Sequence, residues 1–181
     1  MPQSFAFSIL SPFCSPEVQI LAFFGALISA ALYFGCMKQE GDGARAFRTL
    51  NVFVTAGFVV NFLLYYTTGV PEQRGLAFLF VMLSKLIDLA MIYYFYQYMK
   101  RTLNFEGKLA RWTDRGIPIL LVLETLVILS NFFYPTTFLI DAAGTYQSAE
   151  ASIAEDIFLI VASALTAILI IRSKNPRSQK L

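Results

Sequence analysis

Five long apolar blocks restrict what this chain can fold into more than any other feature of its sequence. Of its 181 residues, 57% are hydrophobic and only 14% are charged, and the mean hydropathy is +0.61. A disordered segment has the opposite composition, and a soluble domain has about a quarter of its residues charged. A helix that crosses a bilayer needs roughly 20 mostly apolar residues. The sequence therefore predicts an all-α integral membrane protein.

The apolar blocks predict a single transmembrane bundle of five helices. The expected spans are 18–37, 49–70, 76–99, 117–134 and 153–171. Residues 1–17 are expected to form an external N-terminal arm, which lacks the basic region of a signal peptide. Residues 172–181 are expected to form a basic cytoplasmic tail. Pro118 is expected in the first turn of the fourth span, where a missing N–H costs little.

Basic residues are divided unequally between the two sides of the expected bundle. Loops 38–48 and 100–115 and the tail together hold twelve Lys or Arg residues. The opposite side holds one, Arg74, because the N-terminal arm and the loop 135–152 have none. Cytoplasmic loops of membrane proteins carry the excess of Lys and Arg. We therefore predict an outside N-terminus and a cytoplasmic C-terminus, in a protein that crosses the inner or plasma membrane several times.

Three ionisable residues within the expected spans form the main candidate site, a polar centre in the membrane. Lys85 and Asp88 are three apart on one helix, so their side chains are neighbours. Glu124 lies at a similar depth on the next span. A charge in the bilayer core costs about 2.5 to 3.5 kcal/mol on insertion scales. Two interpretations stay open: a centre that senses a ligand, a proton or helix position, and a structural ion pair that fixes helix register.

Weaker candidates lie on the second span and in the outer loop. Asn61 belongs to a polar stripe near mid-membrane, which suits either an interhelical hydrogen bond or contact with a ligand. Tyr134, Asp141 and Tyr146 are candidate ligand contacts in the outer loop. The alternative for this loop is an ordered cap whose aromatic residues lie at the membrane interface.

Residue types that are absent or rare exclude several kinds of chemistry. The chain has no histidine, which excludes imidazole-based metal and haem sites and a histidine general base. Its two cysteines, Cys14 and Cys36, are too few for a metal cluster and are expected on opposite sides of the bilayer. Phosphate-loop and nucleophile-elbow motifs are also missing. We expect no enzyme activity, no cofactor and no metal, and the net charge of +2 indicates no nucleic-acid partner.

Three segments resemble the N-terminal membrane region of bacterial sensor proteins. They are the aromatic segment 132–134 (FFY), the stretch 141–146 (DAAGTY) and the tail 172–181 (RSKNPRSQKL). In such proteins five to seven spans precede a diguanylate cyclase or histidine kinase output domain. This chain departs from the pattern, with five expected spans and no output domain. The resemblance implies a sensor module cut short or a stand-alone relative, and no catalytic residue carries over.

We therefore expect a membrane-embedded sensor or receptor module that relays a ligand- or membrane-derived signal to a cytoplasmic partner. The alternative is a small membrane transporter or a transporter subunit, in which the buried charges and Asn61 would line a path. The lack of inverted repeats argues against a transporter. The expected partners are the lipid bilayer, a small-molecule ligand and a cytoplasmic signalling protein, and a homo-oligomer is left open.

Overall fold

The computed structural model of the chain describes residues 16–35, 37–38, 40–103, 108–149 and 152–172. Within these ranges it forms the helices α2 (Pro16–Gly35), α3 (Asp42–Thr67), α4 (Arg74–Leu103), α5 (Lys108–Leu129) and α6 (Ser152–Arg172). The strands β1 (Phe138–Ile140) and β2 (Tyr146–Ser148) form an antiparallel hairpin between α5 and α6. The expectation of a mostly helical fold is confirmed, and the hairpin is an addition to it. Cys14, Cys36 and the tail beyond residue 172 lie outside the described residues.

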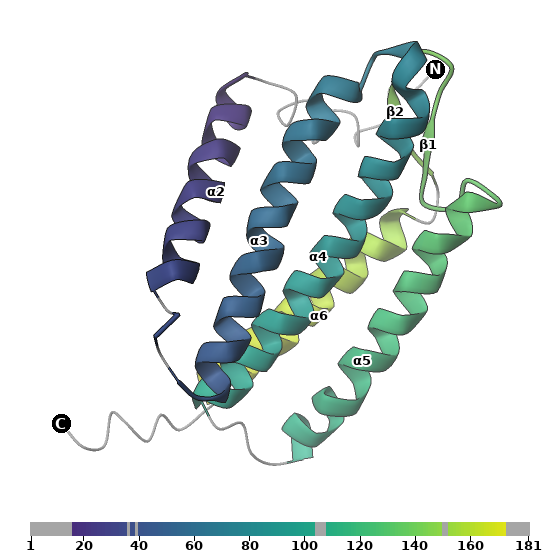
Figure 1. Ribbon diagram of the computed structural model, residues 1–181. Coiled ribbons are helices and arrows are strands. Elements are labelled where there is room, and N and C mark those ends of the chain that lie inside the picture. Colours follow the sequence, from purple (N-terminus) through teal and green to yellow (C-terminus); the bar gives the residue numbers. More distant parts are fainter. Residues whose placement is uncertain (1–15, 36, 39, 104–107, 150–151, 173–181) are drawn as a thin grey trace.

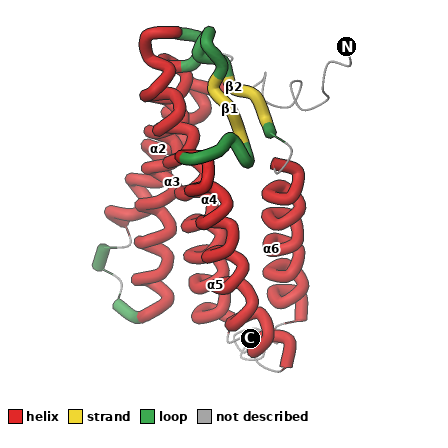
Figure 2. Tube along the Cα trace, turned by 90° about the vertical axis from the view of Figure 1, so that its right-hand side faces the viewer, coloured by secondary structure: helices red, strands yellow, loops and turns green. Residues whose placement is uncertain are grey.

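Successive helices run in opposite directions, so that each connection lies at one of the two ends of the bundle (Figure 1). Helices α2, α3, α4 and α5 lie in a row in Figure 1, and Figure 2 shows α6 on one side of this row, where it contacts α4 and α5. Helix α4 is therefore central, because it packs against α3, α5 and α6. We call the end that holds β1 and β2 the hairpin end.

The opposite end of the bundle gathers most of the positive charge. It contains the turn between α2 and α3, the last turns of α4 and the first turns of α5 (Figure 1). The basic residues described there are Lys38, Arg45, Arg48, Lys100, Arg101, Arg111 and Arg115. We call it the basic end. The fold therefore keeps the unequal charge distribution that the sequence indicated, because alternating helix directions bring alternate loops together.

Helix α5 begins earlier and ends sooner than the apolar block that predicted it. The expected span was 117–134, but the helix starts at Lys108 and ends at Leu129. Pro118 therefore lies inside the helix, and the expectation that it occupies the first turn was wrong. The hydropathy pattern missed the early turns because they are amphipathic, with Thr113 buried while Arg111, Trp112 and Arg115 are exposed. At the other end a 3-10 turn (Ser130–Phe132) follows the helix and leads into the loop.

The largest buried cluster lies at the hairpin end, between α4, α5 and β1. Its members are Ala77, Val81, Met82 and Leu89 of α4, Ile128 of α5, and Phe138 and Ile140 of β1. Side chains alternate between the two faces of a strand, so Phe138 and Ile140 point into the cluster while Leu139 is exposed. The hairpin is thus part of the hydrophobic core, because its buried side chains pack directly against those of α4 and α5.

Many large apolar side chains point outward along the helices, among them Phe24, Ile28, Val59, Val122 and Ile160. Two helical segments in the described ranges, Asp42–Thr67 and Pro71–Leu103, are long and apolar enough to cross a membrane. Their most apolar windows have mean hydropathies of 1.5 and 2.0, yet only 17% and 28% of those windows are buried. The core helix of a soluble protein would be mostly buried, so these apolar surfaces need another apolar environment.

Candidate functional site

Two contacts fix the register between the antiparallel helices α4 and α5. At the hairpin end the rings of Phe78 and Phe132 pack edge to face, with their centroids 5.6 Å apart. At the basic end the Tyr96 hydroxyl donates a hydrogen bond of 2.7 Å to Oδ1 of Asp114. From Phe78 to Tyr96 is 18 residues, and from Asp114 to Phe132 is also 18. The register between the two helices is therefore constant between these two contacts.

This register brings the three predicted ionisable residues to one level. Glu124 lies ten residues beyond Asp114, so it is level with Leu86, ten residues before Tyr96. Leu86 lies between Lys85 and Asp88, near the middle of α4. The depths estimated from the sequence led to the same grouping, but they left open whether α4 and α5 are neighbours.

The side of each helix on which these residues lie follows from the spacing of the buried positions. On α5 and its 3-10 turn, the positions packed against the rest of the bundle are 113, 117, 121, 128 and 131. They recur every three or four residues with one gap, and Glu124 fills that gap. On α4, Phe78 and Tyr96 make the contacts to this side of α5 and its 3-10 turn. Lys85 lies seven residues after Phe78 and eleven before Tyr96, which places it on the same face of the helix. Lys85 and Glu124 therefore belong to the facing stripes of the two helices.

The polar centre is partly enclosed by protein. Lys85, Asp88 and Glu124 are all half-buried, and Oε1 of Glu124 is fully buried. Each of the three residues has an interaction partner in the structure. Asn61 lies at the edge of this level, where its Oδ1 accepts a hydrogen bond of 3.1 Å from the Ser84 hydroxyl. Ser84 precedes Lys85 on α4, so the middle of α4 has polar neighbours toward α3 as well as toward α5.

A polar cluster that sequence reasoning missed joins α4 to α5 at the basic end. The ammonium nitrogen of Lys100 lies 2.8 Å from each carboxylate oxygen of Asp114, which also accepts the Tyr96 hydroxyl. Tyr96 is almost fully buried, whereas Lys100 and Asp114 are about one-third exposed. The residues lie on different helices, so their proximity depends on the register and no spacing within one segment reveals it.

At the hairpin end a single buried amide holds the turn that leads from α5 to β1. The Asn131 amide nitrogen donates to the backbone oxygen of Ile128 at 2.9 Å and to the Thr137 hydroxyl at 2.8 Å. Its oxygen accepts the backbone N–H groups of Thr137 and Phe138, at 3.0 and 3.3 Å. Asn131 thus satisfies buried backbone groups that the helix end would otherwise leave without partners.

The three outer-loop candidates occupy separate positions. The Asp141 carboxylate accepts hydrogen bonds from Ala143, Thr145 and Gln147, which closes the turn between the strands. The bond from the Thr145 hydroxyl, helped by the backbone N–H groups, lowers the pKa of Asp141 below its ordinary value. Tyr146 is half-buried and stacks on Phe138 with their ring centroids 5.9 Å apart. Tyr134 is 72% exposed, and neither of the two cavities described below is lined by any of the three residues.

The hairpin is tied to the connection between α3 and α4. The Gly69 N–H donates to the Gly144 oxygen at 2.9 Å, and Nε of Arg74 donates to the Ile140 oxygen at 3.0 Å. Gly144 has a φ of +78°, and a Cβ there would lie 2.9 Å from the Val70 oxygen. Only glycine fits this close approach without strain. The hairpin is therefore an ordered segment, linked to the connection between α3 and α4 and to the start of α4.

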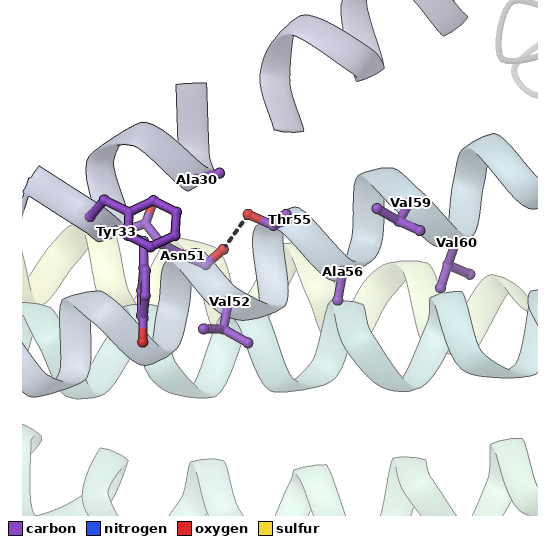
Figure 3. Close-up of a pocket in the computed structure, with 9 residues that line it drawn as sticks. Ala30, Tyr33, Asn51, Val52, Thr55, Ala56, Val59 and Val60 are labelled. Carbon is purple, nitrogen blue, oxygen red and sulfur yellow. Dashed lines mark hydrogen bonds between the residues drawn. The ribbon is translucent and has the colours of Figure 1, made fainter. Parts of the chain in front are cut away.

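A groove of about 400 Å³ lies between α2 and α3. Val52, Ala56 and Val59 follow one another along α3, with Tyr33 of α2 near one end (Figure 3). The polar lining residues include Asn51, which is buried and accepts a hydrogen bond of 3.0 Å from the Ser29 hydroxyl. The small residues Gly25 and Ser29 face α3 there, in line with the packing role of small residues on membrane helices. The groove is apolar and holds no charged group.

Comparison of the chain with protein-family models, with curated proteins and with solved structures found no match in any of the three.

Proposed function

We propose that this chain is an integral membrane protein that crosses the inner or plasma membrane five times. The helices contain between 20 and 30 residues, which corresponds to about 30 to 45 Å at 1.5 Å per residue. The hydrocarbon core of a bilayer is about 30 Å thick, so every helix is long enough to cross it. The outward-facing apolar side chains support the same proposal, because lipid chains would cover them.

The orientation that we propose places the basic end in the cytoplasm and the hairpin end outside. The basic end carries Arg and Lys side chains from α3, α4 and α5, whereas Arg74 is the basic residue described at the hairpin end. The positive-inside rule then gives a cytoplasmic C-terminus, because α6 runs toward the basic end (Figure 1).

We further propose that the protein is a sensor module, with the polar centre of Lys85, Asp88 and Glu124 as its two-state element. The observation that carries this proposal is the register that puts Glu124 level with the other two on the facing side of α5. Charges in a membrane interior are costly and have few favourable arrangements. A shift of α5 along α4 would exchange one set of charge contacts for another, as in known helix-shift switches.

The hairpin is the proposed input and the basic end the proposed output. The hairpin contacts the start of α4 through Arg74 and the end of α5 through Asn131, so a ligand on the hairpin would act on both helices. The Lys100–Asp114 pair joins the same two helices near the cytoplasm. A change in their relative position would therefore be passed to a cytoplasmic partner at this end.

Reporter fusions test the proposed topology. Alkaline phosphatase fused after Gly144 should be active, because that position would be outside, and a fusion after Arg101 should be inactive. A fluorescent protein that folds only in the cytoplasm should give the opposite pattern. Equal activities at the two positions, or the reversed order, would contradict the proposed orientation.

A chimera tests the sensor proposal without a known output. A diguanylate cyclase domain would be joined after Arg172, and the cyclic dinucleotide produced by the membrane fraction would be measured. Glu124→Gln should change this output about tenfold, since coupling free energies of 1–3 kcal/mol correspond to roughly 5- to 150-fold. The matched control Glu72→Gln, which removes an exposed carboxylate at the hairpin end, should leave the output unchanged.

Exchange of Lys85 and Asp88 separates the two interpretations of the polar centre. If the pair only fixes helix register, the exchanged protein (Lys85→Asp with Asp88→Lys) should keep the output of the parent chimera. If the centre is a switch that includes Glu124, the exchange should change the output as Glu124→Gln does. Solute uptake by vesicles that contain the chain, lost in Glu124→Gln, would instead support the transporter alternative.

A further inference from the structure

A second cavity, separate from the polar centre, lies between α3 and α4 at the basic end. Its volume is about 340 Å³. It is lined by Arg45, Ala46 and Thr49 of α3 and by Tyr93, Tyr94, Gln97 and Arg101 of α4. Most of these side chains carry a hydrogen-bonding group, in contrast to the apolar groove between α2 and α3.

Two arginines from different helices line this cavity together. Nη1 of Arg101 donates a hydrogen bond of 3.0 Å to the backbone oxygen of Asp42, which fixes the guanidinium across the first turn of α3. The remaining N–H groups of Arg101 are additional donors, because a guanidinium has five. Arg45 lies one turn after Asp42 and is exposed. The Asp42 carboxylate in this first turn is the nearest acidic group in sequence, and it is exposed to solvent.

The aromatic part of the cavity is held in place by packing. Tyr94 stacks on Phe53 with ring centroids 5.2 Å apart and an interplanar angle of 18°. Tyr93 packs against the buried pair of Tyr96 and Ile117. Because these contacts already order the side chains of the cavity wall, binding of a ligand would cost the protein little conformational entropy.

We propose that this cavity binds a phosphate-bearing anion. Arginine guanidinium groups match the geometry of phosphate oxygens, and hydroxyl and amide groups such as those of Tyr94 and Gln97 supply further donors. Basic pockets between membrane helices on the cytoplasmic side suit the headgroups of anionic lipids. The ligand is therefore an anionic phospholipid headgroup or a soluble phosphate ester, which share this chemistry. The lipid source rests on the proposed membrane insertion, whereas phosphate binding itself does not.

The test uses the full chain in detergent, so its result does not depend on the topology or on the polar centre. Native mass spectrometry would measure binding of phosphatidylglycerol and of diacylglycerol with the same acyl chains but no phosphate. The test variant is Arg45→Gln with Arg101→Gln. The matched control is Arg111→Gln with Arg115→Gln, which removes the same charge from exposed positions at the same end of the bundle.

We expect the Arg45/Arg101 variant to bind phosphatidylglycerol about tenfold more weakly. This is the change in affinity that corresponds to the loss of roughly one hydrogen bond to a charged group. The control should change binding by less than about twofold, because scattered surface charges are screened. Gln97→Leu, which keeps both arginines, should give an intermediate loss and serves as a second test if the double variant does not fold. Circular dichroism would establish that each variant keeps its helices.

Glycerol phosphate added in competition distinguishes the two sources. Displacement of the bound lipid at millimolar concentration would identify a soluble phosphate ester as a sufficient ligand. Retention of the lipid would identify the headgroup together with its acyl chains. Equal binding of diacylglycerol, or an equal loss in the Arg111/Arg115 control, would overturn the proposal.

Discussion

Helices α4 and α5 are joined differently at their two ends. At the hairpin end the connection runs through β1. Asn131, a buried amide with four hydrogen bonds, ties the start of β1 to the end of α5, and β1 in turn packs against α4 in the buried cluster. At the basic end the connection runs through Lys100 and Asp114, a charge pair whose members are each about one-third exposed. The first connection consists of buried hydrogen bonds between neutral groups, and the second is a salt bridge that is partly exposed to solvent.

This difference indicates at which end the two helices can shift more easily relative to each other. Removing one partner from a buried network leaves other polar groups without bonds, which costs about 1–3 kcal/mol for each group. A partly exposed ion pair such as Lys100–Asp114 contributes about 1 kcal/mol, because water and salt screen the charges. The hairpin end is therefore expected to act as the fixed end of the α4–α5 pair and the basic end as the adjustable one. The polar centre lies between them.

The largest effect is expected from Asn131→Leu, which keeps the size of the side chain but removes all four hydrogen bonds. We expect the free energy of unfolding to fall by about 3 kcal/mol, because the N–H groups of Thr137 and Phe138 lose their acceptor while buried. Denaturant titration followed by circular dichroism would measure it. Asn61→Leu, at an exposed position where the amide oxygen accepts a hydrogen bond from Ser84, should cost less than about 1 kcal/mol. Similar losses of stability in the two variants would contradict the expectation that a buried amide contributes more than an exposed one.

The next effect is expected from Gly144→Ala at the turn of the hairpin. Its φ of +78° and the nearby Val70 oxygen should together reduce stability by about 2 kcal/mol. Gly69→Ala is the matched control, because its φ is +81° but a Cβ there would have nothing within 4 Å. That variant should cost about 1 kcal/mol, from the backbone conformation alone. If both cost the same, the close approach to Val70 does not hold the hairpin against the bundle.

A smaller, salt-dependent effect is expected from Asp114→Asn at the basic end. This change removes the charge that Lys100 contacts but keeps an oxygen that can accept the Tyr96 hydroxyl. We expect a loss of about 1 kcal/mol at low salt, which should shrink as the salt concentration rises. The loss in Asn131→Leu should not depend on salt. A loss of 3 kcal/mol or more that persists in high salt would show that the basic end is as firmly fixed as the hairpin end.

The smallest effect is expected from the titration of Asp141. Its pKa in the folded protein is lowered from the model-compound value of 3.8, mainly by the hydrogen bond from Thr145. The stability contributed by this carboxylate is therefore complete above pH 3.8 and is lost as the pH falls through the lower folded value. Thermal midpoints measured across this range should fall less steeply in Asp141→Asn than in the parent. Parallel curves for the two proteins would contradict this role of the carboxylate.

Much of the helical architecture followed from the sequence, but the contacts between helices did not. Apolar blocks located the helices because roughly 20 apolar residues suffice to identify each one. They misplaced the start of α5, since its first turns alternate buried Thr113 with exposed Arg111 and Arg115. The hairpin was treated as a loop because its two strands have only three residues each. The turn between them did carry a signal, namely Asp141 followed by Gly144 at the spacing of a closed turn.

The candidate site divides in the same way. Lys85, Asp88 and Glu124 were recognisable because a charge within an apolar block is exceptional. Asp114 was not, because it lies among the basic residues of a polar segment, where an acidic side chain is ordinary. Arg45 and Arg101 were counted only as part of the positive charge of two loops, and the cavity between them depends on how α3 and α4 pack.

The helical and apolar character of the chain, and the loops that carry its positive charge, can be read from the amino-acid sequence alone. Those properties belong to single segments and to their order along the chain, and successive antiparallel helices place alternate loops at the same end. The packing of the helices was needed to show that α5 lies beside α4 with Glu124 on the facing side, and that Arg45 and Arg101 share a cavity. Such pairings depend on the register between two helices. That register is set by contacts at both ends of the helix pair, and these contacts join segments that are far apart in the sequence.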